Sequence, residues 1–158
     1  MNDQLWHHLA TRRVDFSDTD MAGIVHFSRY FCYVESAEHE FFRKHGLSVT
    51  QKYGDLQYGW PRVKVNAEFR SPLRFEDELE IQLRVNKIGT RSLEFEFSIA
   101  KEPDQTIAAV GSYTTVCVIH KADGSFESAQ LPDKLSKLFK GLVLNSSSGE
   151  HYSRLARK

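Results

Sequence analysis

The chain has 158 residues, a length typical of a single domain, and 41% of them are hydrophobic, which is enough for a compact core. Its 21 Lys and Arg balance its 21 Asp and Glu, so no overall positive field exists to attract nucleic acid or a membrane surface. The chain has no secretory-signal pattern and no apolar run near the ~18 residues of a membrane span. Cys32 and Cys117 lack the spacing of a metal site. We therefore expect a cytoplasmic protein that holds no metal and binds neither nucleic acid nor membrane.

The first third of the chain predicts a strand and then a long helix. Val14 and Phe16 alternate with polar residues in the stretch 12–16, which indicates a strand. Aromatic and aliphatic side chains then recur at helical spacing from residue 27 to 45, and Gly46 is placed to end that helix.

Alternation with a period of two dominates from residue 59 onward. Apolar residues alternate with polar ones in 63–69, 79–85 and 93–99, and a run rich in Val, Thr and Tyr follows from 107 to 120. The breaks SPLRFED, KIGTRS and KEPDQT are good turns, so we expect the strands to pair as an antiparallel meander. Pro132 opens a short helix, and residues 144–158 are expected to form a flexible polar tail.

These elements predict one α+β domain over residues 1–143. A sheet with a single apolar face needs a cover, and the long helix is the only element large enough to provide one. About five antiparallel strands wrapped around one central helix is the hotdog architecture.

The stretch FSDTDMAGIVHFSRY resembles the signature of the 4-hydroxybenzoyl-CoA thioesterase family of hotdog proteins. The family pattern is roughly aromatic-x-D-x-D-x-x-G-[IV]-V, then an aromatic pair and a Tyr early in the helix, which matches Asp18, Asp20, Gly23 and Tyr30. The segment VKVNAEFRSPLRFEDELEIQLRVNKIGTRSLEFEF is similar to the central hairpin of the family. Together the two matches cover roughly residues 12 to 120.

The resemblance implies an enzyme that hydrolyses acyl-CoA or acyl-carrier-protein thioesters. Asp20 stands where the family has its catalytic carboxylate, and the backbone N–H of Phe27 stands where the family binds the thioester carbonyl. The chain departs from better-known bacterial members at Phe16, where some have Tyr, and at His26-Phe27, where they have Tyr-His. The acyl group is therefore not implied, and no cofactor is expected beyond the coenzyme A of the substrate.

Thioester chemistry suits these residue types. Because a thiol has a pKa near ~8.5, the thiolate leaves without strong acid help, and no GxSxG motif is present. What remains necessary is a nucleophile or base, which Asp20 can be, and a donor for the oxyanion, which a helix start supplies. Gly23 has no side chain to block the approach of substrate. Whether Asp20 attacks directly or activates water is left open.

Other polar residues of the motif have simpler interpretations. Asp15 is expected to point outward from the strand, and Asp18 to brace the turn, because acidic residues before a helix commonly form turns and caps. Glu35, two helical turns beyond Phe27, is the rival catalytic carboxylate, although a solvated glutamate is the more usual outcome. His26 is either a helper that orients water or substrate or a partly buried histidine at the helix start.

The phosphates of coenzyme A need cations near the mouth of the pocket. The KIGTRS turn matches the region where the family tends to bind the nucleotide, so we expect Lys87, Arg91 and Ser92 to bind coenzyme A, with Lys121 as a further candidate. Because a hotdog pocket is usually completed by a second copy of the chain, we also expect a homodimer, or a homotetramer built from dimers.

Two other functions are compatible with the sequence. A hotdog hydratase or dehydratase acts on acyl thioesters but needs a catalytic His in a different context from that of His26. A non-catalytic acyl-CoA-binding module would use Asp20 only as a cap.

Overall fold

The computed structural model describes residues 5 to 147, the last three of them by backbone alone. A five-stranded antiparallel sheet forms the body of the molecule, in the order β1-β5-β6-β7-β4. Its strands are β1 (His8–Arg13), β4 (Arg62–Phe69), β5 (Glu78–Ile88), β6 (Ser92–Lys101) and β7 (Thr106–Val116). A second sheet has the order β2-β3-β8-β9 and consists of β2 (Gln51–Tyr53), β3 (Leu56–Gly59), β8 (Val118–His120) and β9 (Phe126–Ser128).

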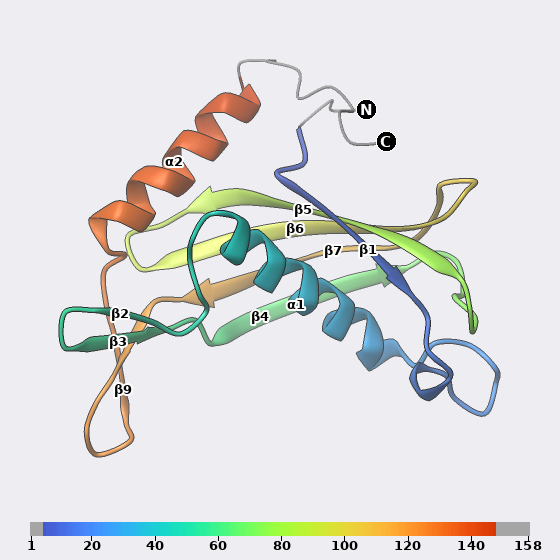
Figure 1. The fold of residues 1–158 in the computed structure, drawn as a ribbon, viewed down its shortest axis with the longest axis horizontal. Coiled ribbons are helices and arrows are strands. Elements are labelled where there is room, and N and C mark those ends of the chain that lie inside the picture. Colours follow the sequence, from blue (N-terminus) through green and yellow to red (C-terminus); the bar gives the residue numbers. More distant parts are fainter. Residues whose placement is uncertain (1–4, 148–158) are drawn as a thin grey trace.

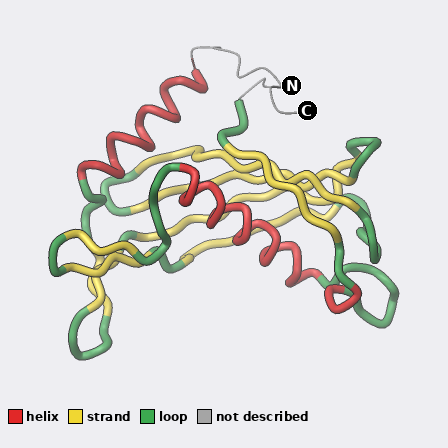
Figure 2. Tube along the Cα trace, in the orientation of Figure 1, coloured by secondary structure: helices red, strands yellow, loops and turns green. Residues whose placement is uncertain are grey.

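Two α-helices pack with these sheets. α1 (Phe27–Lys44) runs across one face of the large sheet, and α2 (Asp133–Ser147) lies beside one end of that sheet (Figure 1). The colouring by secondary structure in Figure 2 shows that a 3₁₀ turn, Phe16–Asp18, and a wide loop after it connect β1 to the start of α1. None of the described helices is long and apolar enough to cross a membrane.

The core lies between α1, α2 and the inner face of the large sheet. Phe41 and Phe42 of α1 are buried against Phe139 of α2, and Phe41 also meets Phe95 of β6 edge to face. The alternation of β5 and β6 explains this arrangement, because every second side chain of each strand is buried over most of its length. The long helix therefore covers the apolar face that the alternating strands present.

The predictions of strands needed three corrections, and that of the C-terminal helix needed one. The described residues hold nine strands in two sheets, more than the five expected, because three-residue strands such as β2 and β9 carry too little alternation to be read. The first strand is His8–Arg13 rather than 12–16, and Phe16 is exposed in the 3₁₀ turn. β4 does not join a meander with β5 but pairs with β7 at the opposite edge. α2 continues to Ser147, so the predicted tail begins four residues early, and its remainder lies outside the described residues.

β4 is an edge strand whose side chains are more exposed to solvent than those of β5 and β6. Seven of its eight residues are exposed, among them Val63 at 62%, Val65 at 43% and Phe69 at 48%. Val65 pairs with the buried Tyr113 of β7, so the two side chains lie on the same face of the sheet. The inner face of β4 thus remains apolar and largely uncovered.

Candidate active site

The stretch between the 3₁₀ turn and α1 folds back on itself as a small hairpin. Thr19 and Val25 form an isolated antiparallel bridge, and the Asp20 amide donates to the Ile24 carbonyl at 2.9 Å. The Val25 amide donates to the Leu73 carbonyl at 2.8 Å, which ties the hairpin to the loop that follows β4. Asp20 therefore sits at the tip of a short, doubly anchored turn.

Gly23 closes this turn in a conformation that favours glycine. Its φ is +72°, in the left-handed region, and its amide donates to the Asp20 carbonyl at 2.9 Å. A Cβ atom would meet only the Arg74 Nη1, at 4.0 Å, so the backbone conformation and not lack of space requires glycine here. The structural reason for glycine at this position is therefore its positive φ, whereas the sequence suggested that glycine lets the substrate approach closely.

The two oxygens of the Asp20 carboxylate have different surroundings. Oδ1 accepts a hydrogen bond from the Ala22 amide at 2.8 Å, which orients the side chain within the turn. In the described part of the chain Oδ2 accepts no hydrogen bond, and the residue is exposed. One oxygen is thus held in place while the other is available to water or substrate.

The start of α1 lies next to this carboxylate on the same cleft. Phe27 is the first helical residue, and within the described residues its amide has no acceptor. His26 caps the helix, because its Nδ1 accepts from the Ser28 amide at 3.4 Å and lies 2.9 Å from the Ser28 hydroxyl. Since an amide can only donate, Nδ1 is unprotonated in this arrangement, and the ring proton of a neutral His26 is on Nε2.

A cleft of about 370 Å³ joins these groups. It is bounded on one side by the hairpin and the start of α1 and on the other by the end of β4 and the loop that follows it. Its lining comprises Asp20, Ile24, Val25, His26, Phe27, Tyr30, Phe69, Arg70, Ser71 and Pro72. The carboxylate and the helix start of the predicted site therefore face one shared space.

Sequence reasoning missed the wall of this cleft that follows β4. Phe69 packs edge to face on Tyr30 at 4.9 Å between ring centroids, and Arg70 and Ser71 donate their amides to the Ala108 carbonyl. Arg70 is exposed and is the cation that lines the cleft. The alternating pattern predicts β4 as a strand. The end of β4 lies beside the start of α1 because β4 is the edge strand of the sheet, and the pattern does not predict this position.

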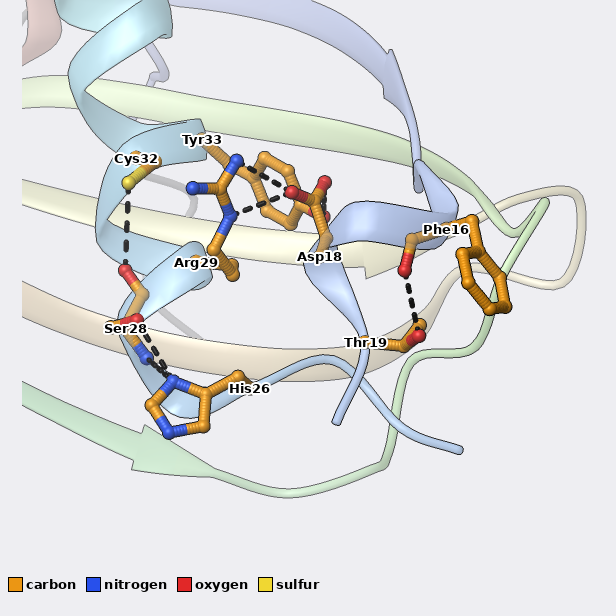
Figure 3. A network of polar contacts seen from close by, with 8 residues as sticks. All are labelled: Phe16, Asp18, Thr19, His26, Ser28, Arg29, Cys32 and Tyr33. Atoms are coloured by element: carbon orange, nitrogen blue, oxygen red, sulfur yellow. Dashed lines mark hydrogen bonds and ion pairs between the residues drawn. The ribbon is translucent and has the colours of Figure 1, made fainter. Parts of the chain in front are cut away.

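Asp18 is buried and does not line the cleft, and its carboxylate lies against Arg29 and Tyr33 of α1 (Figure 3). Its Oδ1 accepts from the Arg29 Nε at 2.6 Å and forms an ion pair with the Arg29 Nη2 at 2.5 Å, while Oδ2 accepts from the Tyr33 hydroxyl at 2.6 Å. Burial, followed by the hydrogen bond to Asp18, raises the pKa of Tyr33 well above its ordinary value, so the phenol stays protonated and donates. The prediction that Asp18 braces the turn agrees with these contacts.

Glu35 belongs to a different cluster, farther along α1. It lies eight residues, about 12 Å, beyond Phe27, does not line the cleft, and pairs with Arg62 of β4 at 3.1 Å. The same arginine pairs with the buried Glu38 and stacks over the Tyr113 ring at 5.0 Å from its centroid. The structure thus brings Asp20, Gly23, His26 and Phe27 together and leaves Glu35 outside.

The four residues predicted to bind coenzyme A also lie elsewhere in the chain. Lys87, Arg91 and Ser92 are in or beside the β5–β6 hairpin, at the end of the sheet opposite the hairpin of Asp20 (Figure 1). β6 has ten residues, so the two ends are separated by about 30 Å. Lys121 pairs with Glu127 at 2.7 Å in the turn between β8 and β9.

Comparison with known protein families shows which family this chain belongs to. A sequence model described as the thioesterase-like superfamily matches residues 14–139, which include the hairpin, α1 and every strand of the large sheet except β1. The chain belongs to the thioesterase-like superfamily. The resemblance to hotdog thioesterases is thereby confirmed.

Individual relatives of this thioesterase are consistent with the family. An Aquifex aeolicus (strain VF5) protein named "Putative esterase" is 36% identical over 110 residues, which are 68% of this chain and 81% of that protein. The Escherichia coli O157:H7 protein named acyl-CoA thioester hydrolase YbgC is 29% identical over 106 residues, 67% of this chain and 78% of the relative. The chain is therefore an enzyme of the thioester hydrolase class.

The fold is shared with solved structures at lower identity. The crystal structure of Slr0204, a 1,4-dihydroxy-2-naphthoyl-CoA thioesterase from Synechocystis, superposes with a TM-score of 0.73. The superposition covers 85% of this chain and 96% of that one at 19% sequence identity. At this identity the likeness establishes the common hotdog fold.

Proposed function

We propose that this thioesterase hydrolyses an acyl-CoA thioester to the free acid and coenzyme A, with Asp20 as nucleophile or general base. The observation that carries the proposal is the convergence of two groups on one cleft, a carboxylate with a free oxygen and a helix N-terminal amide with no acceptor. The first can attack or deprotonate, and the second can stabilise the negative charge that develops on the carbonyl oxygen. The printed name of the YbgC relative supports a coenzyme A thioester as the substrate class.

The reaction needs few other groups. In the general-base route Asp20 takes a proton from water, the hydroxide oxygen bonds to the thioester carbon, and the oxyanion accepts from the Phe27 amide. The C–S bond then breaks, and the thiolate leaves and takes up a proton from solvent. In the nucleophilic route the Asp20 oxygen bonds to the same carbon, the C–S bond breaks and the thiolate leaves, and water then hydrolyses the resulting anhydride to release the acid and regenerate the Asp20 carboxylate.

His26 and Gly23 have supporting roles in this proposal. With Nδ1 turned to Ser28, the Nε2–H of His26 is the donor left to hold the substrate or the attacking water. Gly23 allows the tight turn that carries Asp20. Glu35 is the less favoured catalytic carboxylate because it is paired with Arg62 and does not line the cleft.

The cations predicted for coenzyme A argue for a second copy of the chain. Lys87, Arg91, Ser92 and Lys121 are too far from the cleft of their own chain to share its ligand. Antiparallel pairing of two β4 edges about a two-fold axis would bring the opposite sheet end of the partner toward this cleft, while Arg70 supplies a cation from the chain itself. We therefore propose a homodimer formed through β4, which a homotetramer would contain as its unit.

A panel of aryl- and alkyl-CoA esters tests the function. Release of free thiol from at least one ester, with coenzyme A protecting the protein against thermal unfolding, is the expected result. An absence of thiol release across the panel, with protection by coenzyme A retained, would instead indicate the acyl-CoA-binding module. Addition of water to an unsaturated acyl-CoA without thiol release would indicate the hydratase.

A further inference from the structure

The carboxylate of Asp18 is the most completely satisfied charged group near the cleft, although it does not face the cleft. It is 2% exposed and accepts from Arg29 through one oxygen and from Tyr33 through the other. Burying a carboxylate is unfavourable unless charged and hydrogen-bonding partners compensate for the lost water. Such an arrangement therefore needs a reason beyond filling a turn.

Arg29 and Tyr33 are spaced so that one side chain can hold both. They are four residues apart on α1, which puts them on the same face of the helix within its first two turns. Figure 3 shows both side chains reaching from α1 to Asp18. The hairpin is thus attached to the rigid helix and not only to neighbouring loops.

The backbone of Asp18 makes a second attachment to the same helix. Its carbonyl accepts from the amide of His26, the residue that caps α1, at 2.9 Å. Asp20 lies two residues beyond Asp18, on the strand of the hairpin that is bridged to residues 24 and 25. Any movement of Asp18 away from α1 would therefore move the Asp20 carboxylate relative to the Phe27 amide.

We propose that Asp18, held by Arg29 and Tyr33, is a positioning residue that fixes the distance between the Asp20 carboxylate and the N-terminus of α1. The catalytic part of this inference rests on the proposed function of Asp20. Asp18 acts without touching the substrate, since it does not line the cleft. Tyr33 and Arg29 act only through Asp18.

Variants of the contact between Asp18, Arg29 and Tyr33 (the Asp18 anchor) should lower kcat and leave KM nearly unchanged. In Asp18→Asn and in Tyr33→Phe, which loses only a hydroxyl, we expect kcat to fall about 10- to 100-fold, because misplacement by about 1 Å costs on that order, while KM changes little. The double variant should lose no more than Asp18→Asn alone. Glu40→Gln is the matched control, because it breaks the ion pair between Glu40 and Arg12 in the other half of α1 and should keep wild-type kcat.

Hydrogen exchange reports on the anchor without depending on activity. We expect the Ala22 and His26 amides to exchange about tenfold faster in Asp18→Asn and Tyr33→Phe, as the loss of a hydrogen bond to a charged group predicts, and to be unchanged in Glu40→Gln. Unchanged exchange at these two amides, or faster exchange throughout the molecule, would overturn the positioning role. Faster local exchange with wild-type kcat would overturn its catalytic part, as would a protein in which Asp20→Asn stays fully active.

Discussion

In the proposed function Asp20 combines two roles that are usually treated as alternatives. An aspartate before a helix commonly orders a turn, and here Oδ1 does so by accepting from the Ala22 amide. The same hydrogen bond restricts the side chain of this cleft-lining residue, and Oδ2 accepts no hydrogen bond within the described residues. If Asp20 reacts as proposed, the turn that it orders also orients its carboxylate.

Gly23→Ala tests whether the turn must adopt its left-handed conformation. We expect a loss of about 1–2 kcal/mol in the free energy of unfolding, because an L side chain at φ +72° is strained, and a lower kcat because the hairpin shifts. Urea unfolding and thiol release measure the two effects. Gly124→Ala, at φ +82° in the turn between β8 and β9, should cost similar stability and leave kcat unchanged. Equal losses of kcat in both variants would contradict a specific role for Gly23.

Glu38 is a buried carboxyl group with a strongly perturbed titration. Burial raises its pKa to about 7, against the opposing attraction of Arg62. Between the ordinary pKa of 4.5 and about 7, the folded protein therefore holds more protons at this site than the unfolded chain. The contribution of Glu38 to stability is present at low pH and is lost as the pH rises through this range.

Glu38→Gln should remove that dependence, because glutamine imitates the protonated acid at every pH. We expect the free energy of unfolding of the variant, relative to wild type, to rise steadily between pH 4.5 and 7. Urea titrations at intervals of half a pH unit measure the difference, and a constant difference would be inconsistent with the raised pKa. Comparison with Glu35→Gln, which alters the exposed partner of the same arginine, separates burial from the loss of an ion pair.

At the scale of helices and strands, the sequence pattern predicted the long elements but not which strands pair with each other. α1 spans Phe27–Lys44, close to the expected 27–45, because helical periodicity is carried by residues within one turn of each other. The position of β4 beside β7 depends on contacts between residues at least 40 apart in the chain, and nothing in an alternating stretch specifies its partner. The sequence therefore predicted which residues form the long elements but not the order of the strands.

Gly111 of β7 is the position where the pairing of β4 is most sensitive. A Cβ atom there would lie 2.2 Å from the Asn66 carbonyl oxygen of β4 and 2.5 Å from the Phe97 ring. Gly111→Ala should therefore lower the free energy of unfolding by about 1–3 kcal/mol through overpacking, as measured by urea unfolding. Gly141→Ala in α2, where no atom lies within 4 Å, should instead add about 0.5–1 kcal/mol. Equal stability of wild type and Gly111→Ala would refute this tight approach.

For the whole molecule, the candidate site was predictable where it is contiguous in the chain. Asp20, Gly23, His26 and Phe27 lie within eight residues, so the family motif identified them together; Asp20, His26 and Phe27 line one cleft, and Gly23 lies in the turn that carries Asp20. The wall formed by Phe69 to Pro72 depends on the strand order and was missed for that reason. The residues predicted to bind coenzyme A lie away from the cleft, and they could reach its ligand only in the proposed homodimer.

Val65→Asp tests that second copy. A charge on the exposed apolar face of β4 should dissociate the proposed dimer in sedimentation experiments and reduce thiol release, because the pocket is then incomplete. Leu9→Asp is the matched control, since Leu9 is 55% exposed on β1, the opposite edge of the same sheet. If both variants sediment as the wild type does, β4 is not the interface.

The central claim is that the Asp20 carboxylate carries out the reaction. The most direct measurement is kcat for thiol release by Asp20→Asn, which keeps the size of the side chain and its carbonyl oxygen for the Ala22 amide. With the fold intact by circular dichroism, we predict a loss of at least about a hundredfold, as expected for a positioned base or nucleophile, and near wild-type turnover for Glu35→Gln. An active Asp20→Asn beside an inactive Glu35→Gln would contradict the account and move the reaction to the helix carboxylate.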